Sequence, residues 1–277
     1  MSLELFQRLF QKSWQKIDQK KCLLVFFSLC ICGLLVVFSR VVTLNSGMWL
    51  NLSLSFAPIF LIGGLLFALG IVLIRTYQKE KGDEKVSYLK VTVGSWKAVA
   101  TVAYITLPML LLSLISWLVL GFFFLLKEIP GIGEFVGVFL SFAPFILILS
   151  ALVLVFLNVL LLFFLTPELS QNDTLNFKVL KNIYNRIAQD PLMSFVGLMV
   201  AILPAAFVLL FLVSAAFLTQ KSYLTSSTPI LISLQWFFLM LPFNALLTPS
   251  IIFFFNFSDE CYQNANKSVK QSVSVKS

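Results

Sequence analysis

The charged residues of this chain fall into short clusters, and six long stretches between them carry no charge at all. These stretches cover 22–39, 41–74, 98–126, 135–167, 191–220 and 222–258, and they hold 18, 34, 29, 33, 30 and 37 residues. A helix of about 17 to 25 apolar residues crosses the hydrocarbon core of a bilayer. Each stretch can therefore supply one transmembrane helix, and we expect an all-α membrane protein with six spans.

Composition agrees with this fold class. The chain has 277 residues, of which 59% are hydrophobic and only 12% are charged, whereas soluble domains average about 25% charged residues. Six spans leave little chain for a soluble catalytic domain. We expect an amphipathic interfacial helix over 1–21, a six-helix domain over 22–258, and a polar, disordered cytoplasmic tail over 259–277.

The distribution of Lys and Arg predicts the orientation. Of these 20 residues, all but Arg40, Lys127 and Lys221 fall in the two terminal segments and in the second and fourth loops. Because cytoplasmic loops carry an excess of Lys and Arg, we expect both termini inside a bacterial cytoplasmic (inner) membrane. The net charge of +8 flanks hydrophobic segments, which indicates contact with membrane lipids and no role in nucleic-acid binding. A membrane-protein partner or a homo-oligomer is a further expectation.

Three basic stretches show helical amphipathicity, each just before a pair of spans. In the first, Leu3, Phe6, Phe10, Trp14 and Ile17 fall within an arc of about 80° on a helical wheel. We expect this helix to lie in the headgroup plane, with Phe6, Phe10 and Trp14 as lipid-surface contacts and Trp96 as the equivalent contact of the second stretch. The alternative is that such helices only fix the depth of the following span.

Short motifs indicate an internal repeat. Ser-Trp occurs at 13–14 and 95–96, before the first and third spans, and Ser-Phe-Ala-Pro occurs at 55–58 and 141–144, within the second and fourth spans. Together with the three amphipathic stretches, these matches predict three repeats, each made of an interfacial helix and a helix pair.

No pattern typical of catalysis is present. The chain has no histidine, and no Asp or Glu lies inside a span, so proton shuttles and intramembrane acid pairs are missing. The acidic residues of the second loop, beginning with Glu80, mix with lysines and are interpreted as a solvated face. Cys30 and Cys32 point about 200° apart on a helix and cannot share a metal. We therefore predict no enzymatic activity and no cofactor.

Uncharged polar side chains do lie inside the spans, most notably Asn158, Gln235 and Asn244. An amide in hydrocarbon needs a partner, and interhelical hydrogen bonds of about 1 kcal/mol are the usual answer. We expect these three residues to bind helices together. The alternative is contact with a transported substrate, because prolines such as Pro108 and Pro204 kink their spans and can open a cavity.

Several segments together resemble a known bacterial family. They are an amphipathic stretch with Trp96, a span with Pro108, the turn Ile129-Pro130-Gly131-Ile132-Gly133, and a span ending Phe164-Leu165-Thr166-Pro167. This arrangement, from Leu3 to about Phe257, is similar to the six-helix membrane domain that accompanies some glycerophosphodiester phosphodiesterases and also occurs alone. The catalytic domain of that family has no counterpart here, so the resemblance implies a standalone membrane domain without the phosphodiesterase activity.

The predicted function is that of a non-enzymatic membrane interaction or organising module. The alternative is a small permease-like or lipid-handling transport protein with a Pro-kinked cavity. The lack of any charge inside the spans argues against ion-coupled transport.

Overall fold

The structure is a computed structural model that describes residues 3–43, 48–82, 87–127, 129, 131, 133–172, 177–219 and 229–274. Within these ranges all regular secondary structure is helical. The helices are α1 (Leu3–Gln15), α2 (Gln19–Thr43), α3 (Met48–Lys81), α4 (Tyr88–Gly94), α5 (Trp96–Lys127), α6 (Gly133–Gln171), α7 (Phe177–Gln189), α8 (Pro191–Thr219) and α9 (Pro229–Ser274).

The order of the helices follows the predicted repeat. A short helix precedes two long ones three times: α1 before α2 and α3, α4 before α5 and α6, and α7 before α8 and α9. The six long helices of the described chain each contain a segment long and apolar enough to cross a membrane. The structure thus confirms the prediction of an all-α membrane fold with six spans.

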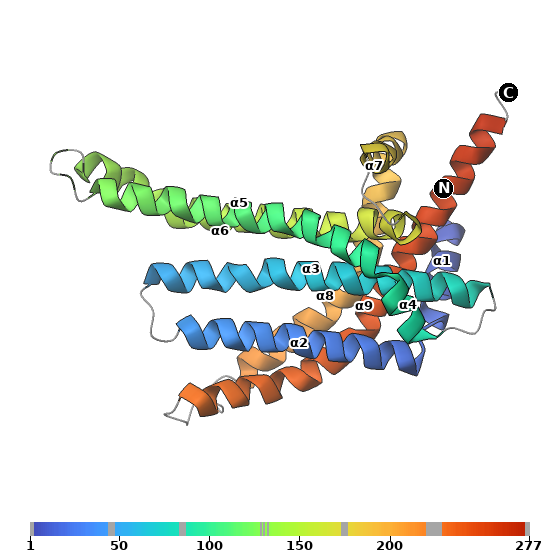
Figure 1. Cartoon of the computed structure of the whole chain (residues 1–277), viewed down its shortest axis with the longest axis horizontal. Helices are drawn as coiled ribbons and strands as arrows, with labels where there is room; N and C mark the ends of the chain where they lie inside the picture. Colours follow the sequence, from blue (N-terminus) through green and yellow to red (C-terminus); the bar gives the residue numbers. More distant parts are fainter. Residues whose placement is uncertain are drawn as a thin grey trace.

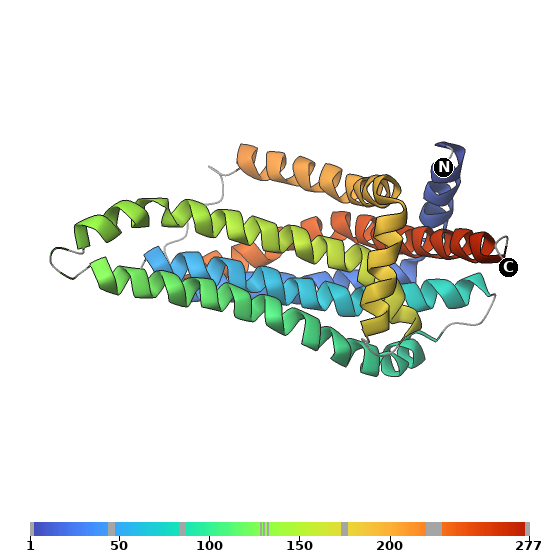
Figure 2. The ribbon, with the colours of Figure 1, turned by 90° about the horizontal axis from the view of Figure 1, so that it is seen from above.

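The three short helices and both termini lie at one end of the molecule (Figure 1). We call this the basic end, since α1, α4 and α7 carry basic residues there. α5 ends and α6 begins at the opposite end, here called the distal end (Figure 1). Seen from above, α7 crosses the long axis of the bundle (Figure 2). An even number of spans is what places the two ends of the chain on the same side.

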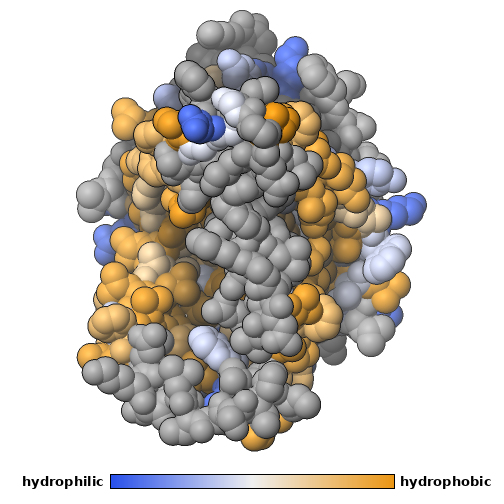
Figure 3. Space-filling view, turned by 90° about the vertical axis from the view of Figure 1, so that its left-hand side faces the viewer, coloured by the Kyte–Doolittle hydropathy of each residue, from blue (hydrophilic) through white to orange (hydrophobic). Residues whose placement is uncertain are grey.

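The most deeply buried side chains gather toward the basic end. They include every residue of 162–170 on α6 and of 252–260 on α9, and most of 67–77 on α3. α9 is enclosed because it packs against α1, α2, α3, α6 and α8. Toward the distal end the helices present large apolar side chains outward, among them Phe122, Phe145 and Phe211. Figure 3 shows such apolar surface on both flanks of the molecule, as expected for helices that face lipid.

Close helix contacts on α3 depend on glycine. A Cβ atom at Gly70 would lie 2.2 Å from Cε1 of Phe255 on α9, and one at Gly63 would lie 1.9 Å from Nδ2 of Asn158 on α6. Lipid tails are as apolar as the side chains of a span, so helices associate in a membrane mainly by close packing. α3 can therefore lie at the centre of the bundle, in contact with α2, α5, α6 and α9.

The segment after residue 258 differs from the sequence-based expectation of a disordered tail. Helix α9 continues without interruption to Ser274. The physical reason is that Asp259, Glu260 and Tyr262 are buried against other helices, so this part of the chain has contacts that stabilise an ordered backbone.

Replacing Gly70 with Ala should lower the free energy of unfolding by about 1 to 3 kcal/mol, the usual cost of overpacking a core. The ring of Phe255 is almost fully buried, so any shift that accommodates the new Cβ atom must disturb its packing. An SDS titration in mixed micelles would measure the loss. Gly94→Ala is the matched control, because a Cβ atom there meets nothing within 4 Å. Equal stability of both variants would contradict the tight α3–α9 contact.

Candidate functional site

The last turns of α3 carry polar residues on two different faces. Residues three and four apart share one face of a helix, so Tyr77, Glu80 and Lys81 point one way while Arg75, Gln78 and Lys79 point another. The first face meets α2 and α9. The second lies beside α4 and α6. Two sites are thus built from one helix end, and Gln78 connects them, because it also donates to Asp259 of α9.

The first face forms a cluster of charged side chains that we call the charged junction. Its members are Lys12, Lys21, Tyr77, Glu80, Lys81, Asp259 and Glu260. Glu260 is only 5% exposed, and its carboxylate accepts a hydrogen bond of 2.6 Å from the Tyr77 hydroxyl. Lys81 Nζ lies 2.5 Å and Lys12 Nζ 3.3 Å from the same carboxylate. One acidic side chain of α9 therefore binds donors from α1 and α3.

Two lysines lie over the ring of Tyr77. Lys21 Nζ is 5.4 Å and Lys81 Nζ 5.5 Å from the ring centroid, within the range of a cation–π interaction. The side chain of Lys21 is fully buried and forms an ion pair of 2.6 Å with Glu80. Glu80 thus lies in a structural ion pair, which corrects its interpretation as part of a solvated face. The other acidic residues of that segment, Asp83 and Glu84, lie outside the described residues. Nothing in the local sequence indicates this pair, because Lys21 and Glu80 lie 59 positions apart.

Tyr88, at the start of α4, extends the same hydrogen-bonded network. Its hydroxyl lies 3.3 Å from Asp18 Oδ2 and 3.4 Å from Glu80 Oε1. Burial, and then the negative charges of Glu80 and Asp18, raise the pKa of the Tyr88 phenol well above its ordinary value. The hydroxyl therefore stays protonated, and its single hydrogen is shared between the two carboxylates.

Asp259 is held by amides instead of cations. Gln78 Nε2 donates to Asp259 Oδ1 at 2.7 Å, and Gln263 Nε2 donates to Asp259 Oδ2 at 2.6 Å. Asn256, one turn earlier on α9, donates from Nδ2 to the carbonyl oxygen of Ser13 on α1. Buried polar groups are stable only when they are hydrogen-bonded. These bonds fix α9 to α1 and α3 in one register.

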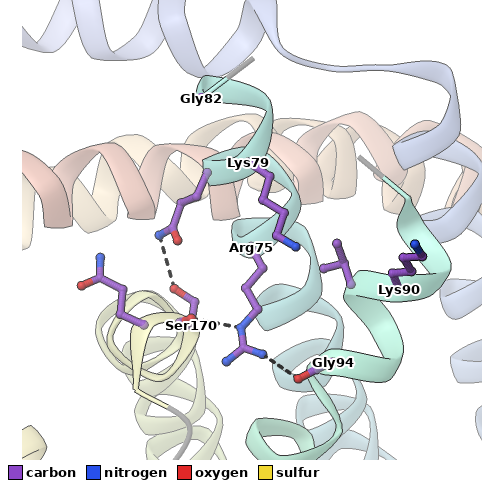
Figure 4. Close-up of a pocket in the computed structure, with 9 residues that line it drawn as sticks. Arg75, Lys79, Gly82, Lys90, Gly94 and Ser170 are labelled. Atoms are coloured by element: carbon purple, nitrogen blue, oxygen red, sulfur yellow. Dashed lines mark hydrogen bonds between the residues drawn. The ribbon is translucent and has the colours of Figure 1, made fainter. Parts of the chain in front are cut away.

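The second face of α3 borders a pocket of about 500 Å³ that we call the basic pocket (Figure 4). The described residues that line it are Arg75, Gln78, Lys79 and Gly82 of the α3 end, Lys90, Val91 and Gly94 of α4, and Ser170 and Gln171 of α6. Three of these nine are cations, and none of the nine is acidic. Arg75 donates from Nε to the carbonyl oxygen of Ser170 and from Nη1 to that of Gly94. Its guanidinium group thus connects α3 with α4 and α6.

The predicted lipid-surface residues have unequal positions. Trp96 is 72% exposed at the start of α5. Phe10 and Trp14 are partly exposed, and their rings also contact Phe253 of α9, with centroids 4.8 and 5.6 Å away. Phe6 packs against the buried core. The apolar face of α1 therefore covers α9 and leaves only part of its surface for lipid.

The predicted intramembrane amides are not brought together. Asn158 contacts Gly63 at the α3–α6 interface. Asn244 lies between α9 and α2, with Nδ2 3.9 Å from Cys30 Sγ. Gln235 lies on an exposed part of α9. The three residues belong to three separate places and do not line the basic pocket.

Sequence reasoning missed both sites. The available signal was the helical spacing of polar residues at the end of α3 and the pair Asp259-Glu260, placed directly after a charge-free span on the side rich in cations. Acidic groups there are natural partners for lysines. Within the described residues, no group of three or more His, Cys, Asp or Glu could hold a metal ion.

Comparisons with family models, with curated proteins and with solved structures find no match to this chain. The resemblance to the membrane domain of glycerophosphodiester phosphodiesterases therefore stays a prediction.

Glu260→Gln should destabilise the protein by about 2 kcal/mol or more, because it leaves Lys12 and Lys81 without their carboxylate. Fully buried pairs lose about 3 to 5 kcal/mol when one partner is removed, and the partial exposure of both lysines reduces that loss. The measurement is SDS-induced unfolding, with faster amide exchange in α1 as a second readout. The control Glu134→Gln changes an exposed carboxylate and should cost under about 1 kcal/mol. Equal effects would show that the junction contributes nothing specific.

Proposed function

We propose that this chain is a non-enzymatic interaction or organising module of a bacterial cytoplasmic membrane, with its basic end in the cytoplasm. One observation carries this proposal: the charged junction holds the basic end in a defined shape while aromatic side chains around it stay exposed. Trp96 and Tyr184 are each 72% exposed, and Trp14 is 47% exposed. They lie on α5, α7 and α1, at or beside the basic end.

Exposed aromatic residues on ordered helices are typical of contact surfaces. Trp and Tyr combine a large apolar area with a polar group, so they suit both the membrane interface and protein contacts. α7 also has one strongly apolar face, which is consistent with a helix at the boundary between lipid and water. The exposed residues would meet headgroups or a second membrane protein at the same level.

The contacts of the polar groups favour this role over transport or catalysis. Asn158 and Asn244 lie at helix interfaces, which supports a packing role for both amides. The carboxylates of Glu260 and Asp259 are occupied by donors from neighbouring helices. Groups engaged in this way stabilise the bundle and are poorly placed to transfer protons to a substrate.

The proposed orientation can be tested with single cysteines in a cysteine-free background. Ile129→Cys at the distal end should react in intact cells with a membrane-impermeant thiol reagent, because Ile129 is exposed there. Gly82→Cys at the basic end should react only after the membrane is permeabilised. The inverse pattern would overturn the cytoplasmic placement that the excess of Lys and Arg supports.

The interaction role can be tested by photo-crosslinking in cells. A photoreactive phenylalanine at Trp96 or Tyr184 should give a discrete protein adduct, either with a second copy or with another membrane protein. The same residue at Phe207, which is exposed on α8, is the control and should crosslink mainly to lipid. Val93→Asp places a charge on the exposed side of α4 beside Trp96 and should abolish the Trp96 adduct. Adducts that are equal at all three positions, or unchanged by Val93→Asp, would contradict the proposal.

A further inference from the structure

The basic pocket differs in kind from the charged junction, although both share the end of α3. In the junction, Lys12, Lys21 and Lys81 each pair with a carboxylate. Within the described part of the chain, which leaves out 83–86, Lys79 and Lys90 form no hydrogen bond or ion pair, and both are exposed. The cations at the α1 and α9 side therefore stabilise the fold, whereas the two lysines of the pocket have no structural partner among the residues that the structure describes.

We propose that the basic pocket binds the phosphate group of an anionic ligand. Arg75, Lys79 and Lys90 project from α3 and α4 around it (Figure 4). Guanidinium and ammonium groups form strong, charge-assisted hydrogen bonds with phosphate oxygens. A volume of about 500 Å³ exceeds the needs of a single phosphate ion, so a phosphate ester with an attached polar group also fits.

The charge balance of the pocket favours an anion. The carbonyl groups that hold Arg75 belong to the C-terminal turns of α4 and α6, and each helix C-terminus carries about −0.5 of an elementary charge. These carbonyl groups explain why a cation is stable at position 75. They offset about one of the three positive charges of Arg75, Lys79 and Lys90, and leave the described lining with a net positive charge.

Arg75 also gives the pocket a fixed shape. Its guanidinium group donates to Gly94, Ser95 and Ser170, so α3, α4 and α6 are already held together before a ligand arrives. A preformed site loses little conformational entropy on binding.

Phosphate could come from an anionic phospholipid headgroup or from a soluble phosphate ester, and binding measurements separate the two. The purified full-length protein would be titrated with phosphatidylglycerol, with phosphatidylcholine, and with inorganic phosphate or glycerol 3-phosphate. Native mass spectrometry would quantify bound lipid, and calorimetry in phosphatidylcholine nanodiscs would quantify the soluble anions.

The test variant is Lys79→Gln combined with Lys90→Gln. Neither lysine bonds to another described residue, so the fold should remain intact, whereas an Arg75 substitution would remove the bonds from α3 to α4 and α6. The matched control is Lys20→Gln combined with Lys181→Gln, which removes the same charge from exposed lysines outside the pocket. We expect the pocket variant to weaken binding about tenfold to thirtyfold, and the control variant less than about threefold.

A loss confined to phosphatidylglycerol would support the pocket as a lipid headgroup site. A loss confined to inorganic phosphate or glycerol 3-phosphate would support a soluble ester. Equal binding of every probe by the pocket variant and the control variant would overturn the proposal, because attraction would then reflect only net charge. This result is independent of the photo-crosslinking test, which does not involve Lys79 or Lys90.

Discussion

The buried carboxylate of Glu260 is the group on which the arrangement of the basic end depends. A carboxylate removed from water costs several kcal/mol unless cations and hydrogen-bond donors surround it. Here the donors come from Tyr77 and Lys81 of α3 and from Lys12 of α1. A rotation of α9 by one residue would turn Glu260 about 100° away from all three. Apolar packing alone tolerates many registers in a bundle rich in Leu and Phe, whereas this set of contacts selects one.

The parts of the fold that were predictable are those set by general constraints. Membrane thickness fixes the length of a span, and helical periodicity marks α1, α4 and α7, so both could be predicted from local sequence. The charged junction depends on pairs far apart in the chain: Lys12 and Glu260 are separated by 248 positions. A count of lysines treats Lys21 as a lipid-facing charge, although it is fully buried against Glu80. The continuation of α9 past residue 258 was missed for the same reason, since its order depends on those distant partners.

The Ser-Trp motif shows how a short repeat can mark a structural position. Ser13 and Ser95 are both fully buried, and each donates its hydroxyl to the carbonyl oxygen four residues earlier. Each also binds a polar side chain from a long helix: the Ser13 carbonyl accepts from Asn256, and the Ser95 hydroxyl accepts from Arg75. The following tryptophans, Trp14 and Trp96, are partly or largely exposed. The motif therefore marks where an interfacial helix is bonded to the bundle, with an aromatic side chain left at the surface.

At the end of α3, helical geometry places the lysine that stabilises the fold and the lysine that faces the basic pocket on different sides of the helix. Lys81 lies two residues after Lys79, about 200° around the helix, and this rotation places one ammonium group against Glu260 and the other beside the basic pocket. A structural cation is most useful when it is buried and paired, as Lys21 is, because its contacts then fix neighbouring helices. A binding cation must instead stay accessible, and Lys79 and Lys90 are exposed without a partner among the described residues. Since Arg75 bonds the second face of α3 to α4 and α6, the rigidity that the charged junction gives to α3 extends to the pocket.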